Sequence, residues 1–448
     1  MFISVIGCGY LGAVHAACMA DLGHQVIGVD VEEVKVKELS AGRAPFFEPG
    51  LPELLERASA SGRLRFDHDL ATLARPAGTG DAEPRVHFVC VGTPQRTGEF
   101  AADTGYVEAA VHALVPFLHP GDLVVGKSTV PVGTAQRLAD VVAATAPGAM
   151  LAWNPEFLRE GHAVADTQRP DRLVYGLPPD PAAAEAARAL LDAVYADAVA
   201  NGVPVILADY ATSELVKTAA NAFLATKISF INAMAEVCEA AGADVATLAR
   251  AIGHDDRIGP KFLGAGLGFG GGCLPKDIRA FMARAGELGA DQALTFLREV
   301  DAINMRRRIR MVELAREVLG GSFLGKKVAV LGAAFKPDSD DIRDSPALNV
   351  AAQIKLQGAD VVVTDPAAIE NARQLWPGLQ FAETAEQACA RADAVLLLTE
   401  WKVYRELDPA ALGGIVRART VLDGRNALDP ARWRAAGWTY RALGRPRA

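Results

Sequence analysis

The chain has 448 residues, of which half are hydrophobic and 22% are charged, and its formal net charge is -8. This length exceeds one ordinary core and predicts two or three domains of globular composition. The negative charge argues against a nucleic-acid partner. No basic run suggests a membrane surface, and no apolar run approaches the roughly 18 residues of a membrane span, so we expect no membrane partner.

The cysteines and histidines give no sign of a metal site or of secretion. The six cysteines are scattered without a CxxC pair, and the eight histidines lack a spacing such as HExxH. The first residues, MFISVIG, lack the basic region of a signal peptide and are typical of a first strand. We therefore expect a reduced, cytoplasmic protein without a bound metal.

The first half of the chain alternates short apolar runs with alanine-rich helical stretches. The predicted strands are Phe2–Ile6, Gln25–Val29, 87–91, Leu123–Gly126, 149–153 and 203–207. Helical stretches such as 11–22 and 106–118 lie between them, and the Gly/Pro-rich segment 76–84 is predicted to be a surface loop. This alternation predicts a parallel sheet covered by helices.

The pattern changes at residue 210. No proline or strand signal occurs for over thirty residues, and apolar residues recur at helical spacing up to Gly242, which predicts one long helix. Shorter helices are expected to about residue 320. A second α/β unit follows from Gly325, with strands at 326–331, Asp360–Thr364 and 392–399. Its first helix is expected to begin with Ser345 as N-cap and Pro346 at the first helical position.

Residues 7–12 read GCGYLG, which matches the GxGxxG pattern between a predicted strand and a predicted helix. Gly7 would allow the tight turn, Gly9 would let the backbone approach a pyrophosphate, and Gly12 would let helix and strand pack. Tyr10 and Leu11 open the helix whose N-terminus would face the phosphates. A strand, turn and helix without a cofactor is the alternative, which this context disfavours.

The second predicted strand ends at Asp30, whose carboxylate would accept hydrogen bonds from the adenosine ribose and repel a 2′-phosphate. NAD is therefore favoured over NADP, although Lys35 weakens this inference. Thr93 and Thr129 follow two further strands in the stretches VGTP and KSTVP. Ligands bind at the carboxyl ends of such strands, so both threonines are placed to meet the cofactor; ordinary turn chemistry is the alternative.

A cysteine ends the glycine-rich stretch GFGGGCLPKD at residues 268–277. Pro275 suits the first turn of a new helix, and the positive end of that helix would favour the Cys273 thiolate. Asp277, four residues on, would return to the same side of the helix. Taken alone, the stretch is also explained by a buried, inert cysteine.

Lys217 and Asn221 lie four residues apart on the predicted long helix and share a face. The lysine either extends to solvent or is held in a cleft, where it could stabilise an oxyanion together with the amide. In the stretch NPEFLREG, residues 154–161, Glu156 could be a base or could orient water. The alternative is a solvent-facing acid at the start of a helix.

NAD and a reactive thiol together suggest the oxidation of an aldehyde. The thiolate would add to the aldehyde, the resulting thiohemiacetal would lose hydride to form a thioester, and water would release a carboxylate. Because the covalent bond retains the aldehyde, a second oxidation becomes possible.

The chain resembles the UDP-glucose/GDP-mannose dehydrogenase family over residues 3–426. The matching stretches are VIGCGYLG, VGTP, KSTVPVGT, NPEFLREG, ELVKTAANAF, RIGPKFLGAGLGFGGGCLPKD, LGAAFKPDSDDIRDSP and LDGRN. The resemblance implies two oxidations at C6 of a sugar nucleotide with NAD as cofactor, converting UDP-glucose to UDP-glucuronate. TDP-glucose and GDP-mannose are the alternative substrates. A nucleotide-binding protein without activity is the alternative of another class.

The resemblance also assigns site residues. It implies Cys273 as the nucleophile, Lys217 and Asn221 as oxyanion partners, and Asp277, Thr129 and Glu156 in water and proton handling. It places Lys276 and Arg343 at NAD together with Lys35. The implied contacts of the sugar nucleotide are Glu156, Phe157, Leu158, Arg159, Lys217, Asn221, Phe262, Leu263, Gly264, Ala265, Gly266, Gly270, Lys336 and Arg425. Arg257 would reach the substrate across the interface of a homodimer built on the long helix.

The expected architecture is α/β with three domains. They are an N-terminal NAD-binding Rossmann-type domain at 1–208, a central helical and dimerisation domain carrying the cysteine at 209–320, and a C-terminal Rossmann-like domain for the sugar nucleotide at 321–448. The last domain lacks GxGxxG, because LGAAFK follows its first strand, so a second dinucleotide is not expected. By the resemblance, three positions depart from members of the family: many have a serine at Gly272, some have a phenylalanine at Leu274, and some animal members have a lysine at Gly264.

Overall fold

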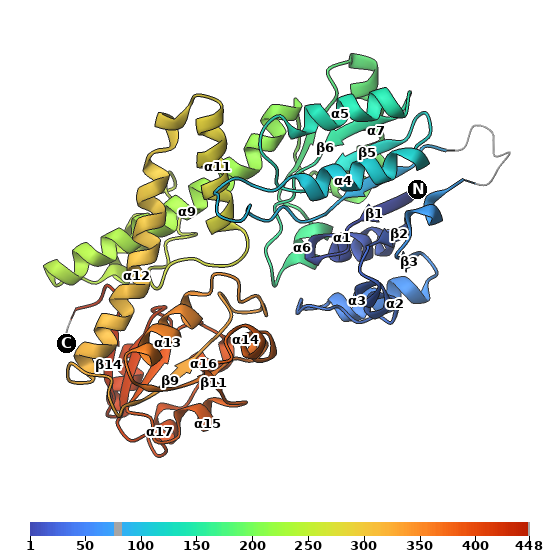
Figure 1. Ribbon diagram of the computed structural model, residues 1–448. Helices are drawn as coiled ribbons and strands as arrows, with labels where there is room; N and C mark the ends of the chain where they lie inside the picture. The colour runs from blue at the N-terminus through green and yellow to red at the C-terminus, as the bar shows by residue number, and fades with distance from the viewer. Residues whose placement is uncertain (76–82, 447–448) are drawn as a thin grey trace. The chain divides into compact units, whose positions relative to one another are not determined.

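The structure, a computed structural model, describes residues 1–75 and 83–446 and divides into two compact units (Figure 1). The first unit comprises Met1–Ala220 and Arg279–Leu288, and the second comprises Asn221–Ile278 and Gly289–Ala448. Most of the predicted surface loop at 76–84 lies outside the described residues. The division into three domains remains a prediction.

The first unit is built on an eight-stranded sheet with the order β3-β2-β1-β4-β5-β6-β7-β8. Its strands are β1 (Phe2–Ile6), β2 (Gln25–Val29), β3 (Leu64–Asp67), β4 (Val86–Val89), β5 (Leu123–Gly126), β6 (Met150–Trp153), β7 (Leu173–Gly176) and β8 (Val205–Ala208). Neighbouring strands are parallel except β6 and β7, which pair antiparallel. The predicted strands are confirmed, whereas β3 and β7 were not predicted.

This sheet is buried on both faces, as its nearly continuous apolar strands require. Along β1, Ile3 and Val5 belong to one hydrophobic cluster and Ile6 to another, because successive side chains point to opposite faces. The remaining elements of this part of the chain are α1 (Tyr10–Asp21), α2 (Glu33–Ser40), α3 (Leu51–Ala60), η1 (Leu70–Leu73), α4 (Gly105–Leu114), η2 (Val115–Phe117), α5 (Thr134–Thr145), α6 (Ala163–Gln168), α7 (Pro181–Val194) and α8 (Ala196–Ala200).

The predicted long helix is confirmed as α9 (Tyr210–Ala241), drawn in green in Figure 1. It contains no proline or glycine and ends before Gly242, whose φ of 72° is a left-handed conformation that glycine adopts without strain. It is followed by α10 (Val245–Gly253), α11 (Leu274–Glu287), η3 (Asp291–Leu294) and α12 (Phe296–Val318). The predicted series of shorter helices after α9 is therefore also confirmed.

The second unit carries a six-stranded, fully parallel sheet with the order β11-β10-β9-β12-β13-β14. Its elements are β9 (Lys327–Leu331), α13 (Pro346–Leu356), β10 (Asp360–Thr364), α14 (Ile369–Leu375), β11 (Gln380–Phe381), α15 (Ala385–Cys389), β12 (Ala394–Leu397), α16 (Lys402–Arg405), α17 (Pro409–Leu412), β13 (Thr420–Asp423), α18 (Pro430–Ala435) and β14 (Thr439–Ala442). Ser345 caps α13 as predicted, since its side chain accepts from the Leu348 N–H.

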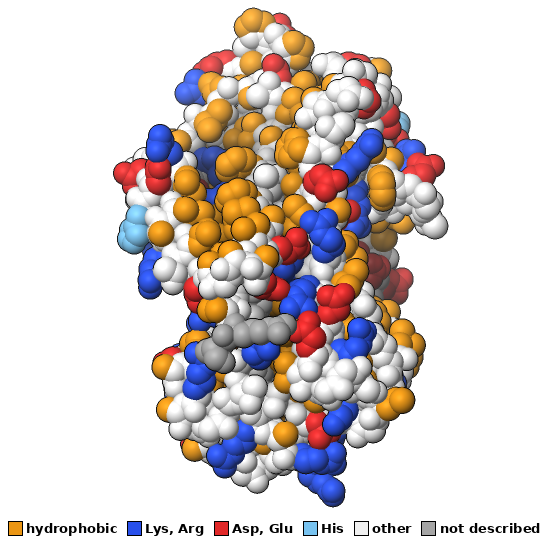
Figure 2. All heavy atoms as spheres, turned by 90° about the vertical axis from the view of Figure 1, so that its left-hand side faces the viewer, with side chains coloured by type: hydrophobic (Ala, Val, Ile, Leu, Met, Phe, Trp, Pro, Cys, Tyr) orange, Lys and Arg blue, Asp and Glu red, His pale blue; other side chains and the backbone are white. Residues whose placement is uncertain are grey.

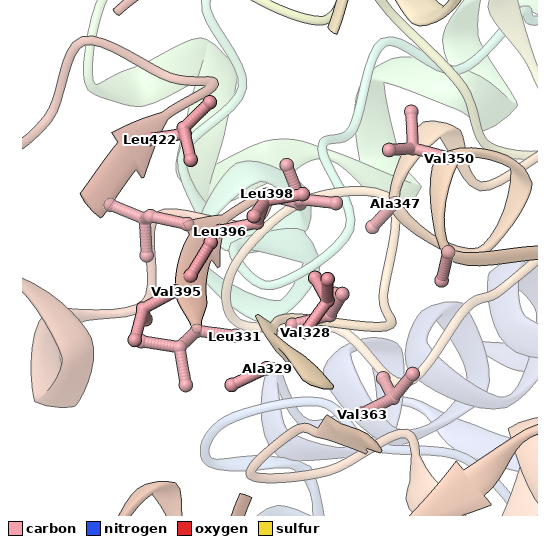
Figure 3. Close-up of a cluster of buried hydrophobic side chains, with 14 of the residues drawn as sticks. Val328, Ala329, Leu331, Ala347, Val350, Val363, Val395, Leu396, Leu398 and Leu422 are labelled. Carbon is pink, nitrogen blue, oxygen red and sulfur yellow. The ribbon is translucent and has the colours of Figure 1, made fainter. Parts of the chain in front are cut away.

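The core of this second sheet joins strand and helix side chains. Figure 3 shows Val328, Val363 and Val395 of three neighbouring strands together with Ala347 and Val350 of α13. The predicted α/β class, with two largely parallel sheets and a helical region between them in sequence, is therefore confirmed.

Candidate active site

Four of the predicted site segments follow four neighbouring strands of the first sheet. The backbone N–H of Cys90 donates to the Ile6 carbonyl, that of Lys127 to Val89, and that of Asn154 to Gly126. The residues after β1, β4, β5 and β6 therefore leave the sheet at one edge. This edge includes the point beside β1 where the strand order reverses, which is where open α/β sheets bind ligands.

The three glycines of the GCGYLG loop differ in the space around them. Gly7 has a φ of 88°, and a Cβ there would lie 2.6 Å from the Val91 side chain. A Cβ on Gly12 would lie 1.8 Å from the Gly7 carbonyl oxygen, so only glycine lets α1 pack here. A Cβ on Gly9 would meet no described heavy atom within 4 Å. The loop thus leaves open space at the residue that should face a pyrophosphate.

Asp30 is buried directly behind this loop. Its Oδ2 accepts from the Cys8 N–H at 2.7 Å, and its Oδ1 accepts from the Glu32 N–H at 3.0 Å. Lys35 places its ammonium 3.0 Å from the same carboxylate, where it offsets part of the negative charge. A carboxylate held against the glycine loop fits a dinucleotide whose ribose it would orient.

The second unit has a counterpart of Asp30 that accepts from more N–H groups. Asp365 follows β10 as Asp30 follows β2. Its carboxylate accepts hydrogen bonds from five N–H groups, those of Ala333, Ala334, Ala367, Ala368 and the Trp401 indole. A carboxylate has about four lone-pair positions. The donors to Asp30 are two backbone N–H groups and the Lys35 ammonium, so Asp365 has less capacity than Asp30 for the hydroxyls of a ribose.

The threonines after β4 and β5 lie in two loops that are hydrogen-bonded to each other. The Thr93 hydroxyl donates to the Thr129 carbonyl at 2.8 Å, and the Ser128 hydroxyl donates to the Val91 carbonyl at 2.7 Å. Both loops leave the cofactor edge of the sheet. The two threonines therefore lie in neighbouring loops, and their contact with the cofactor stays a prediction.

A buried lysine that the sequence did not single out clamps the start of the NPEFLREG stretch. Lys127 donates to Asn154 Oδ1 at 2.8 Å and to the Tyr195 hydroxyl at 3.1 Å, and that hydroxyl donates to Asn154 Oδ1 at 2.7 Å. Burial lowers the pKa of Lys127 to about 8. A lysine after an apolar strand is ordinarily expected at the surface, so no sequence signal marked its burial.

Lys217 and Glu156 form a largely buried ion pair, with Lys217 Nζ 2.8 Å from Glu156 Oε1. The ammonium also lies 5.7 Å from the centre of the Phe157 ring, and Glu156 Oε2 accepts from the Leu158 N–H. Because Lys217 is only 6% exposed, the alternative of a lysine extending to solvent is wrong. Arg159 is exposed and pairs with Asp166.

Cys273 is exposed, whereas the other five cysteines are buried. It directly precedes α11, and its exposure shows that the alternative of a buried cysteine is wrong. Asp277, one turn into the helix, is 2% exposed and accepts from Asn221 Nδ2 at 2.6 Å and from Lys276 Nζ at 2.7 Å. The backbone N–H of Asp277 donates to the Cys273 carbonyl, so the polar cluster adjoins the thiol in the chain.

The loop before Cys273 is held by side chains that the sequence did not point to. Asn304 of α12 accepts from the Phe269 N–H at 2.7 Å and donates to its carbonyl at 2.9 Å. Arg308 donates to the Phe269 carbonyl at 3.3 Å and pairs with Asp344. A Cβ on Gly268 would overlap Asn304, so a glycine is required there. No motif announces such contacts because they join segments distant in sequence.

Arg425 and Lys336, expected on the sugar-nucleotide side, lie in the second unit. All three guanidinium nitrogens of Arg425 donate to carbonyls, those of Leu398, Gly268 and Phe335. Lys336 is half-buried, with its ammonium 5.3 Å from the Phe335 ring centre. Arg425 therefore braces the cysteine loop in addition to any contact with a ligand.

The remaining predicted residues of this unit differ in exposure. Phe262, with a φ of 64°, and Gly264 are exposed, whereas Leu263, Ala265 and Gly266 are buried. Gly270 packs against the Asp344 carbonyl, and Arg257 is exposed beside Asp255. A Cβ on Gly272 would lie 2.2 Å from Cζ of Arg343, so the glycine leaves room for this exposed guanidinium.

The fold and the cofactor loop define an NAD-binding dehydrogenase with two Rossmann-type sheets. The chain belongs to the UDP-glucose/GDP-mannose dehydrogenase family. It matches the NAD binding domain of that family over residues 1–199, the central domain over 211–306 and the UDP binding domain over 329–430. The UDP binding domain indicates a nucleotide-sugar ligand for the second sheet.

Full-length relatives agree with this assignment. The chain is 42% identical over 448 residues to a UDP-glucose 6-dehydrogenase of Rhizobium meliloti, covering 100% of both proteins. It is 39% identical over 461 residues to a UDP-glucose 6-dehydrogenase of Pseudomonas aeruginosa, covering 100% of this chain and 98% of that protein. A solved UDP-glucose dehydrogenase from Pyrobaculum islandicum superposes with a TM-score of 0.86 at 39% identity, covering 99% of this chain and 98% of the other.

Two further observations concern the described ranges, 1–75 and 83–446. None of their helices combines the length and apolar character that crossing a membrane requires. No group of three or more His, Cys, Asp or Glu side chains in these ranges is arranged to hold a metal ion.

Proposed function

We propose that this protein oxidises UDP-glucose at C6 to UDP-glucuronate in two NAD-dependent steps, with Cys273 as the nucleophile of the second. The observation that carries the proposal is the exposure of Cys273 at the start of α11, with the carboxylate of Asp277 one turn away. The likeness over the full length to UDP-glucose 6-dehydrogenases supports the choice of substrate.

The chemistry follows from an aldehyde and a thiol. NAD accepts the hydride in each oxidation. After the C6 alcohol becomes an aldehyde, the Cys273 sulfur bonds to C6 and the carbonyl oxygen gains negative charge. Loss of hydride from C6 gives a thioester, and attack by water breaks the C–S bond to release the carboxylate and the thiol. The N-terminus of α11 favours the thiolate that begins the addition.

The polar residues divide into donors and acceptors. Lys217 and Asn221, on successive turns of α9, supply the ammonium and amide donors for the oxyanion. Asp277, Glu156 and Thr129 orient water and move protons. The sugar nucleotide is held by Glu156, Phe157, Leu158, Arg159, Phe262, Leu263, Gly264, Ala265, Gly266, Gly270, Lys336 and Arg425. NAD contacts Gly7, Gly9, Tyr10, Leu11, Gly12, Asp30, Lys35, Thr93, Thr129, Glu156, Lys276 and Arg343.

A homodimer is part of the proposal, with Arg257 reaching the substrate of the second subunit. Phe223, Phe230 and Val237 of α9 are exposed by 67%, 50% and 57%. They are spaced by seven residues and so share one face of the helix, as in helix pairs that bury such a stripe. Figure 2 shows hydrophobic side chains gathered on the side of the molecule where α9 and α12 lie.

A cytoplasmic location also belongs to the proposal, since the five buried cysteines form no disulfide.

The substrate is tested by the absorbance of NADH with UDP-glucose, TDP-glucose, GDP-mannose and UDP-N-acetylglucosamine. We expect UDP-glucose to have the highest kcat/KM and to yield two NADH per uronate. A higher kcat/KM with TDP-glucose or GDP-mannose would assign the alternative substrate. No turnover with any nucleotide sugar would favour a binding protein without activity.

The nucleophile is tested by Cys273→Ala, which should form no carboxylate because the aldehyde is no longer captured. Cys238→Ala, at a buried cysteine of α9, is the control and should keep product formation. Product is followed by chromatography of the nucleotide sugars. Full uronate formation by Cys273→Ala would refute the covalent mechanism.

A further inference from the structure

The side chain of Tyr10 joins the cofactor loop to a buried carboxylate. Tyr10 is the first residue of α1 and belongs to the GCGYLG loop. Its hydroxyl donates to Glu48 Oε2, and its ring packs against Phe46 at 4.9 Å between centres. Glu48 is 3% exposed and lies in the segment between α2 and α3. The glycine motif explains the backbone of this loop but assigns no role to the tyrosine hydroxyl.

The same carboxylate holds the end of the NPEFLREG stretch. Glu48 Oε2 accepts from the Gly161 N–H at 2.7 Å, and Oε1 accepts from the Ala163 N–H at 2.7 Å. The Gly161 N–H also lies 3.1 Å from the Tyr10 hydroxyl oxygen, which accepts from it. Three segments that are distant in sequence therefore meet on one buried carboxylate.

The NPEFLREG stretch is thus held at both ends, by a lysine at its start and by a carboxylate and a tyrosine at its end. At its start, Asn154 is clamped by Lys127, which follows β5. At its end, Gly161 is held by Glu48 and by Tyr10 of the cofactor loop. Glu156 lies between these anchors and pairs with Lys217. A displacement of Tyr10 would leave the buried Glu48 short of a donor, which is costly, so the cofactor loop and this stretch should move together.

We propose that Tyr10 and Glu48 are positioning residues that couple NAD binding to nucleotide-sugar binding, by holding residues 156–159 in register with the cofactor loop. This inference rests on the proposed function, because it takes 156–159 as substrate contacts. Neither side chain takes part in the chemistry. Binding of NAD orders the GCGYLG loop and, through Tyr10 and Glu48, the far end of the NPEFLREG stretch. Each ligand therefore binds more tightly when the other is present.

The electrostatics of the pair agree with this role. Burial, followed by the hydrogen bond and charge of Glu48, raises the pKa of Tyr10 well above its ordinary value. The hydroxyl therefore remains protonated at neutral pH and can donate to Glu48.

The test compares the Kd of UDP-glucose, measured by calorimetry, without NADH and with saturating NADH. The ratio of the two values is the coupling factor, and factors of about 5 to 150 are typical. We expect the unmodified protein to show a factor of at least about five. Tyr10→Phe should lower the factor several-fold, and Glu48→Gln should bring it close to one. Tyr106→Phe and Glu53→Gln, at exposed positions of the same unit, should leave it unchanged.

Because Glu48 is buried, Glu48→Gln can lose stability, and Tyr10→Phe then decides the matter, since it removes one hydroxyl and keeps the ring. An unchanged factor in Tyr10→Phe, or a factor of one in the unmodified protein, overturns the coupling. A residue that only binds NAD would change the Kd of NADH and leave the factor as it was. If UDP-glucose does not bind at all, the proposed substrate fails instead, and the same ratio is measured with the nucleotide sugar that the substrate panel selects.

Discussion

Lys127 illustrates how one buried side chain connects the site to the pH dependence of stability. Burial lowers its pKa in the folded protein to about 8, whereas an unfolded lysine has a pKa of about 10.4. Folding therefore disfavours the protonated form. The contribution of this group to stability is fully present above the unfolded pKa and is lost as the pH falls through the folded pKa.

We therefore expect Lys127→Met to remove a pH dependence. Between pH 7 and pH 9.5 the free energy of unfolding of the unmodified protein should rise by about 2 kcal/mol relative to that of the variant. The measurement is urea unfolding of both proteins at each pH, which cancels the loss of hydrogen bonds common to all pH values. A difference between the two proteins that stays constant with pH would contradict the lowered pKa of Lys127.

At the residue scale, the sequence pointed to the groups that we propose to carry the chemistry but not to those that hold them. Cys273, Lys217, Asn221, Asp277 and Glu156 stand in recognisable stretches with glycines or helical spacing. The supporting residues are Lys127, Glu48, Asn304 and Arg308, which contact groups from 27 to 115 positions away. Such contacts leave no local pattern, so they could not be predicted.

At the scale of elements, two successive turns of α9 each carry a side chain that binds a carboxylate. Lys217 pairs with Glu156, and Asn221, one turn later, donates to Asp277. The spacing of four residues placed both side chains on one face, as predicted. The partners, Glu156 and Asp277, lie on other segments of the chain, so these two pairings could be known only from the tertiary structure.

We expect Lys217→Ala to lower kcat by about 100-fold or more, as removal of one oxyanion donor does, with a smaller effect on the KM of NAD. Lys227→Ala is the matched control on the same helix. Its ammonium donates to the Ile258 carbonyl and takes no part in the proposed site. Steady-state kinetics with UDP-glucose measure both variants. An unchanged kcat in Lys217→Ala would remove the lysine from its assigned role.

The predictability of the elements followed their length and regularity. α9 was predicted because 32 residues without proline or glycine repeat apolar side chains at helical spacing. The strands β3, β7, β11, β13 and β14 were not predicted, because pairing in a sheet defines them more than their composition does.

At the scale of the whole molecule, the proposed homodimer would bury the exposed apolar face of α9. Phe230→Asp should convert a dimer into the 47.2 kDa monomer, because a carboxylate would be buried at the centre of the stripe. Activity should fall as well, since Arg257 would no longer reach the substrate of the second subunit. Leu375→Asp, at an exposed position of α14, is the control and should keep both the dimer and the activity. Analytical ultracentrifugation decides the mass, and a Phe230→Asp protein that remains dimeric would place the interface elsewhere.

By itself, the sequence determined the α/β class, the NAD loop and the long helix, and it singled out the cysteine that we propose as the nucleophile. Each is encoded by neighbours in the chain, where glycine conformations and side-chain periodicity act directly. Only the tertiary structure decided that Cys273 is exposed while Lys217 is buried, and that one carboxylate, Glu48, links the cofactor loop to the substrate stretch. Burial and long-range pairing depend on which distant segments meet, and the folded sheets alone bring those segments together.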